Sequence, residues 1–255
     1  MKKIIYIFSI LISIFSCASD SDDNISQITT TFNFTHSWDN TNVSNANFNT
    51  IQFKNENEEN LSITKLRYLI SKITFIKSSG EELVLDGYNL IDVTNNSKLT
   101  YSPVNTIPTG TYANVKFTFG FNNDDNYNNN YQDLNSASWN VPGILGGGYH
   151  FMQLEGKFID NTATETGYAY HAIRAVDNSG ATQVFQDTFF EVNLGEVEIT
   201  NNATFNINMN IAEWFKSPNT WDLNALNNML MPNFNAQVLI FENGQNVFSL
   251  ESVSQ

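Results

Sequence analysis

The sequence predicts an all-β domain, an antiparallel β-sandwich or barrel-like fold with one or two short C-terminal helices. Three observations support this class. Apolar residues mostly alternate with polar ones, which is the period of a half-buried strand. Phenylalanine, which favours strands, is abundant, with 20 in 255 residues. Asparagine-rich turn signals separate many short apolar runs, a pattern typical of sandwiches and barrels.

Three segments show the alternation most clearly. Residues 31–36 place Phe32, Phe34 and His36 on one face of a strand, and residues 113–121 and 203–211 repeat the pattern. Further strands are expected at 48–53, 66–76, 82–85, 88–93, 149–158, 167–174, 184–192 and 236–241. Short helices are expected at 211–216 and at 222–231, the second with Asp222 as its N-cap.

The N-terminal segment has the pattern of a bacterial lipoprotein signal. Lys2 and Lys3 precede an apolar run that is too short to span a membrane, which requires about 20 residues. The run ends at Cys17, the only cysteine, in a context that resembles a lipobox. We therefore expect residues 1–16 to be a signal peptide and Cys17 to carry the lipid, palmitate among its acyl chains.

The expected domain organisation follows from this signal. Residues 17–30 would be an acylated, serine- and aspartate-rich flexible tether. Residues 31–255 contain no Pro-rich or Gly-Ser linker and no internal repeat, so a single β domain is expected. Lipidation would place this domain in the cell envelope, at the outer membrane and exposed at the surface.

The charge of the chain limits its partners. The formal net charge is −14, and removal of Lys2 and Lys3 with the signal would leave −16 (−14 minus 2). An acidic surface repels nucleic acid and anionic lipid. Nucleic acid is therefore not an expected partner, and the lipid anchor is the expected contact with a membrane.

One acidic loop is a candidate calcium site. Residues 122–135 are rich in Asn and contain Asp124, Asp125 and Asp133, which are oxygen donors of the kind that calcium prefers. Their spacing lacks the regularity and the terminal Glu of the helix–loop–helix calcium motif. A solvated loop is the alternative interpretation.

The histidines are the candidate metal ligands. No phosphate loop, nucleophile elbow, zinc-protease helix or paired-Cys motif is present in the sequence, so no enzymatic activity is expected. Strand parity directs His36, His150 and His171 toward apolar faces, where imidazole needs a partner. That partner is either a protein group, as in an ordinary core histidine, or a copper or zinc ion. Met152 could add a soft sulfur ligand, and Trp139 would anchor the loop before His150.

Several segments, in order along the chain, resemble one known family. They are residues 32–36, 63–73, 88–92 and 110–112, Trp139 with residues 148–156, residues 168–171, and residues 242–248. The family is the MbnP-like copper-binding proteins, found as lipoproteins in Bacteroidetes and linked to copper uptake in methane oxidisers.

The resemblance implies a β-rich fold and a mononuclear copper site with histidine ligands. It also implies that a tryptophan next to the site is oxidised to kynurenine by a partner di-haem enzyme. Carried onto this chain, the ligands would be His36, His150 and His171, and the oxidisable residue would be Trp139. The family often has two tryptophans near the Gly-Tyr pair, whereas here residues 141–147 separate Trp139 from Tyr149.

Two functions remain open from the sequence. The first is an exported lipoprotein that binds copper through histidines for metal acquisition or handling. The second is a metal-free surface binding or adhesion module. The second predicts that the three imidazoles lie far apart.

Overall fold

The computed structural model describes residues 26–255; the expected signal peptide and Cys17 lie outside this range. The strands are β1 (Gln27–Ile28), β2 (Thr30–Trp38), β3 (Thr41–Asn42), β4 (Phe53–Lys54), β5 (Asn60–Lys77), β6 (Glu82–Val84), β7 (Tyr88–Asp92), β8 (Thr100–Tyr101), β9 (Ile107–Pro108), β10 (Gly110–Phe119), β11 (Met152–Ile159), β12 (Glu165–Ala172), β13 (Ala175–Asp177), β14 (Val184–Gln186), β15 (Phe190–Ile199), β16 (Ala203–Asn210) and β17 (Phe248–Ser254). The helices are α1 (Gln132–Ser136) and α2 (Phe234–Gly244), with 3-10 turns η1 (Asn45–Asn47), η2 (Gly143–Leu145) and η3 (Ile211–Phe215).

The larger sheet is built around the long strand β5. Its order is β12-β11-β5-β10-β15, and β4, β6 and β7 also pair with β5. All of these pairings are antiparallel, so the sheet agrees with the antiparallel sandwich expected from the sequence. Because β5 has 18 residues, it carries side chains along the whole length of the sheet.

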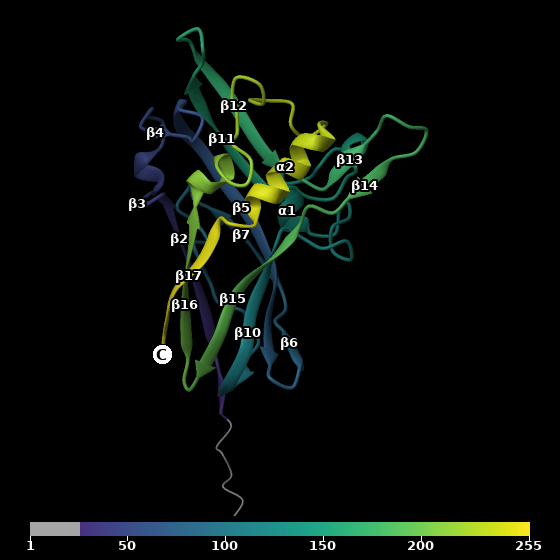
Figure 1. Cartoon of the computed structure of the whole chain (residues 1–255). Coiled ribbons are helices and arrows are strands. Elements are labelled where there is room, and N and C mark those ends of the chain that lie inside the picture. Colours follow the sequence, from purple (N-terminus) through teal and green to yellow (C-terminus); the bar gives the residue numbers. More distant parts are fainter. Residues whose placement is uncertain (1–25) are drawn as a thin grey trace, which may run out of the picture.

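The smaller sheet covers one face of the larger one. Its order is β17-β16-β2-β3, with β8 also pairing with β2. The β16–β2 pairing is parallel, which departs from the otherwise antiparallel arrangement. Figure 1 shows the two sheets stacked along the molecule, with the first described residues at the end opposite α2 and the β13–β14 hairpin.

The main core lies between the sheets and is rich in aromatic rings. Phe34 of β2 packs edge-on against Tyr68 of β5 and Phe117 of β10, with centroid distances of 6.2 and 6.0 Å. A smaller cluster lies on the opposite face of β5; its buried members are Leu69, Leu90, Phe121, Leu134, Trp139 and Tyr149. The two faces of β5 therefore carry two separate apolar clusters.

Two expectations near the C-terminus are wrong. Residues 236–241, expected as a strand, lie in helix α2, because Asn233 caps it by accepting from the Ala236 amide. The buried residues Ala236, Gln237 and Ile240 have helical spacing. Residues 222–231, expected as a helix, form turns; the Asp222 side chain accepts from the Asn224 amide, which supports one turn without a helix after it.

Other strand and helix boundaries differ from those expected from the sequence. The expected strand 184–192 is split into β14 and β15. Of residues 48–53, only Phe53 is in a strand. The 3-10 turn η3 matches the expected helix at 211–216. The first strand, β1, begins at Gln27, inside the segment expected to be tether.

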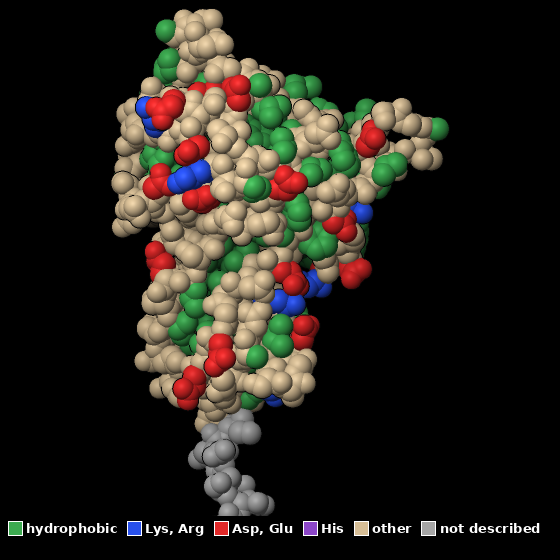
Figure 2. All heavy atoms as spheres, in the orientation of Figure 1, with side chains coloured by type: hydrophobic (Ala, Val, Ile, Leu, Met, Phe, Trp, Pro, Cys, Tyr) green, Lys and Arg blue, Asp and Glu red, His purple; other side chains and the backbone are tan. Residues whose placement is uncertain are grey.

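The surface is sparsely charged. Acidic side chains outnumber Lys and Arg on the face shown in Figure 2, in keeping with the net charge of −14. Within residues 26–255, no helix combines the length and the apolar character that a membrane span requires.

Candidate metal centre

His150 is a buried imidazole with one nitrogen left without a partner. It lies just before β11 and is 5% exposed. Its Nδ1 is 3.0 Å from the carbonyl oxygen of Trp139. A carbonyl only accepts, so Nδ1 carries the hydrogen and Nε2 carries the lone pair. That Nε2 is buried and has no hydrogen-bond partner among the described residues.

Burial also fixes the charge of this ring. Desolvation lowers the pKa of His150 to about 4, although the hydrogen bond to the Trp139 carbonyl opposes the change. The ring is therefore neutral at pH 7. A neutral imidazole with a free lone pair is the form that binds a metal.

His171 is the second imidazole of the site and comes from β12. Its Nε2 is 2.9 Å from Oε1 of Glu155, and Lys65 Nζ is 2.8 Å from the same oxygen. The hydrogen bond from His171 lowers the pKa of Glu155 to about 2, with Lys65 contributing and desolvation opposing. The carboxylate is thus ionised and accepts a hydrogen bond from Nε2–H, so Nδ1 is the His171 ring nitrogen that Glu155 does not engage.

The two rings are neighbours. The centroids of His150 and His171 are 5.4 Å apart and the rings are nearly perpendicular, at 83°. The Trp139 ring lies 5.6 Å from the His150 ring. Carboxylate and carbonyl acceptors on the outer nitrogens are the partners that metal-binding histidines usually have. Two neighbouring imidazoles are ligands of the type that copper and zinc favour.

The loop before β11 brings Trp139 to His150. Asn140 and Tyr149 form an isolated antiparallel bridge, and the His150 amide donates to the Trp139 carbonyl at 3.0 Å. Residues 141–147, the insertion noted in the sequence, loop out from this bridge. Gly148, with φ of +75°, follows it; a Cβ there would lie 2.4 Å from Oδ1 of Asn126. The insertion leaves Trp139 and His150 in contact.

Trp139 is enclosed on its other side. The side chain is 0% exposed and its Nε1 has no hydrogen-bond partner within residues 26–255. The Arg67 guanidinium lies 4.9 Å from the ring centroid, which is a cation–π contact. Arg67 is in turn 3.5 Å from Asp92. The indole is therefore held in place next to His150.

His36, an expected ligand, and Met152, a residue that could have added a sulfur, lie elsewhere. His36 shares a 3.0 Å hydrogen bond with the Tyr68 hydroxyl in the main core, and burial lowers its pKa to about 4. Met152 pairs with Tyr68 and Ala172, and it packs in the same core. Since neighbours along a strand point to opposite faces, Tyr68 and Arg67 are on opposite sides of the sheet. The structure therefore places His36 on the opposite face of the sheet from His171 and does not bring the three histidines together.

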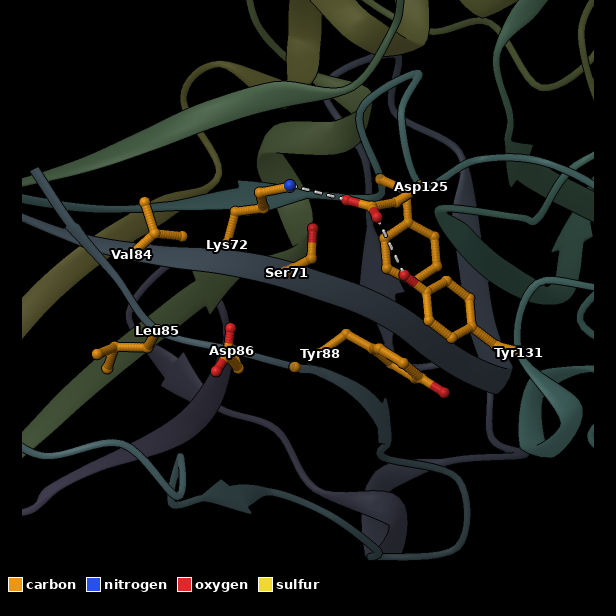
Figure 3. Close-up of a pocket in the computed structure, with 10 residues that line it drawn as sticks. Ser71, Lys72, Val84, Leu85, Asp86, Tyr88, Asp125 and Tyr131 are labelled. Carbon is orange, nitrogen blue, oxygen red and sulfur yellow. Dashed lines mark hydrogen bonds and ion pairs between the residues drawn. The ribbon is translucent and has the colours of Figure 1, made fainter.

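The acidic loop at 122–135 does not form a calcium cluster. Asp125 pairs with Lys72 at 2.9 Å and accepts from the Tyr131 hydroxyl at 3.3 Å, while Asp133 accepts from Tyr88. Within the described part of the chain, no three His, Cys, Asp or Glu side chains form a group that could hold a metal. Asp125 instead lines a cavity of about 240 Å³ beside Lys72 and Tyr131 (Figure 3).

Sequence reasoning missed Glu155 and Arg67 as parts of the site. The strand pairing places both on this face, since Glu155 lies two residues from Gln153, which pairs with His171 on β12 and Arg67 on β5. Register between strands decides this, and one sequence does not show register.

Comparisons with known proteins identify a family for this chain. The family model described as MbnP matches residues 27–232. Among solved structures, MbnP from Methylosinus trichosporium is similar, with 12% identity, a TM-score of 0.48, and coverage of 77% of this chain and 81% of that chain. Comparison with curated proteins gives no match. Since the family model covers most of the residues, the chain belongs to the MbnP family.

Proposed function

We propose that this protein binds one copper ion through Nε2 of His150 and the imidazole of His171. The observation that carries the proposal is the buried, unpartnered Nε2 of His150, 5.4 Å in ring-centroid distance from a second imidazole. A buried acceptor without a partner costs about 1–3 kcal/mol, and a bound metal would remove that cost.

The donor chemistry favours copper over hard cations. Imidazole nitrogen suits copper and zinc, whereas calcium and magnesium require several oxygen ligands. Membership of the MbnP family supports a metal-related role in general terms. The two imidazoles would give copper two ligands. Any further ligand would come from a group other than a His, Cys, Asp or Glu side chain.

Glu155 and the Trp139 carbonyl would act as orienting groups. Each accepts a hydrogen bond from the ring nitrogen that does not face the metal. We propose that the protein sequesters or hands on the metal and has no catalytic turnover. The bound copper would be held by its affinity for the two imidazoles and would supply no reaction chemistry.

The position and processing of the protein complete the proposal. Lipidation of Cys17 would hold the domain in the cell envelope, where it meets copper from outside the cell. Conversion of Trp139 to kynurenine by a di-haem partner would add an oxygen and an amine donor beside His150. Intact mass of native protein, compared with protein made without that partner, tests the conversion.

Copper titration of the purified protein tests the site. We expect one copper per chain in the wild type and loss of that binding in both His150→Ala and His171→Ala. His36→Gln is the matched control, because His36 is equally buried and lies in the main core. Unchanged binding in the first two variants would contradict the proposal. Absence of copper binding in the wild type would favour the metal-free surface module.

A further inference from the structure

An apolar cavity with two methionines opens onto His171. Its volume is about 360 Å³. One wall comes from the loop before β11, with Pro142, Ile144 and Leu145, and the other from residues 229–232. Ala169 and His171 of β12 complete the lining. No Asp, Glu, Lys or Arg side chain is among the lining residues, so the cavity offers sulfur and imidazole as its metal-binding groups.

A buried glutamine fixes the methionine wall to the backbone of His171. The Gln237 side chain is 0% exposed, and its Nε2 donates to the carbonyls of His171, at 2.8 Å, and Leu230, at 3.1 Å. Leu230 is the residue between Met229 and Met231. The amide of Ala169 donates to the carbonyl of Asn227 at 2.7 Å, which holds the same segment against β12. The two methionines are thus held close to the second imidazole.

The methionines differ in exposure. Met229 is 74% exposed, whereas Met231 is half-buried, as is His171, with 16% of its side chain exposed. Met229 also has φ of +55°, a left-handed conformation that is unusual for a long side chain. A methionine that only filled a core gap would be buried. Exposure therefore falls from Met229, through Met231 and His171, to the buried His150.

Thioether sulfur selects monovalent copper. Soft ligands such as methionine prefer Cu(I), and an apolar surround without carboxylates disfavours harder divalent cations. We propose that Met229 and Met231 form a Cu(I) loading site, from which the ion passes to His171 and then to His150. The inference rests on the proposed copper function of the histidine pair.

The transfer is a ligand exchange. Sulfur–copper bonds break as nitrogen–copper bonds form, so copper keeps its oxidation state and no electron or proton donor is required. The metal moves down the exposure gradient from the rim into the buried site. The loading site therefore sets the rate at which copper enters, while the histidine pair sets the final affinity.

Two measurements on the full-length protein test the inference. The first is NMR of methionine methyl groups labelled with carbon-13, with Ag(I) as a diamagnetic substitute for Cu(I). We expect the Met229 and Met231 methyls to shift, while those of the buried Met152 and Met209 stay unchanged as internal controls. The second is stopped-flow transfer of Cu(I) from a coloured chelator complex.

The decisive variant is Met229→Leu/Met231→Leu, which keeps the wall apolar and removes both sulfurs. We expect several-fold slower loading with unchanged final affinity. Ile144→Ala, which alters the opposite wall without touching sulfur, should load at the wild-type rate. Wild-type loading rates in the double variant, or unshifted methyls, would overturn the loading site and leave the histidine site standing. No Cu(I) uptake by the wild type would overturn both.

Discussion

Replacing His36 should flatten the acid side of the stability profile and leave copper binding intact. Burial lowers the pKa of His36 to about 4, from 6.5 for the exposed side chain. Above pH 6.5 the ring is neutral in both folded and unfolded chains. Between 6.5 and 4 the unfolded chain binds a proton that the folded chain does not, so the free energy of unfolding falls as the pH falls.

The size of the effect follows from the two pKa values. A difference from 6.5 to about 4 corresponds to about 3 kcal/mol once the pH is below 4, and to about 2 kcal/mol lost between pH 7.5 and pH 5. His150, whose pKa is also lowered to about 4, contributes a loss of similar size in the metal-free protein. The wild type should therefore lose about 4 kcal/mol over this interval from its two buried histidines.

Urea unfolding with a chelator present, at pH 7.5, 6 and 5, measures this loss. In His36→Gln the amide can still bond to the Tyr68 hydroxyl but does not titrate, so the loss between pH 7.5 and 5 should shrink by about 2 kcal/mol. Carboxylates titrate alike in both proteins and cancel in the difference. Equal pH dependence in the two proteins would refute the assignment of His36 as a neutral core residue. Loss of copper binding in the variant would refute its separation from the site.

Three further outcomes are expected. Glu155→Gln removes the carboxylate that orients His171, and copper affinity in a chelator competition should fall by about 10–100-fold. Gly156→Ala would place a Cβ 1.9 Å from the Ser62 carbonyl oxygen, so chemical denaturation should show a loss of about 1–3 kcal/mol or a failure to fold. Gln237→Leu removes three buried hydrogen bonds, those donated to the carbonyls of His171 and Leu230 and the one accepted from the Ile173 amide, and the free energy of unfolding should drop by about 2 kcal/mol or more. A stability equal to wild type in either of the last two variants would contradict the packing described for it.

Strand periodicity predicted the fold class, because alternation is a local property of an extended chain. It placed Phe32, Phe34 and His36 on one buried face, as the structure has them. It failed at 236–241, where a short, mostly apolar run fits either a strand or a helix. The deciding signal was Asn233. Its side chain accepts a hydrogen bond from the Ala236 amide and so caps the start of the helix.

The site was harder to predict because it depends on pairing between distant segments. Strand alternation predicted that His150 shares a face with Met152 and Leu154. Strand β11 begins only at Met152, so the alternation does not extend back to His150. Strand alternation also predicted that His36 and His171 point toward apolar faces. It did not show that these are different faces of the sandwich. Only the register of β5 with β11 settles which face each side chain occupies.

Because of this register, the two faces of β5 contact different parts of the protein. Tyr68 faces the main core and binds His36, while the adjacent Arg67 faces outward and covers Trp139. A buried histidine that already has a hydroxyl partner has little to gain from a metal, whereas His150 has a buried nitrogen that no group within residues 26–255 hydrogen-bonds. Burial alone therefore does not distinguish a core histidine from a ligand, since both rings are equally buried and have similar pKa values. The distinguishing property is which hydrogen bonds remain unmade, and by that property the candidate ligand is His150, with His171 as the imidazole beside it on the Arg67 side of the strand.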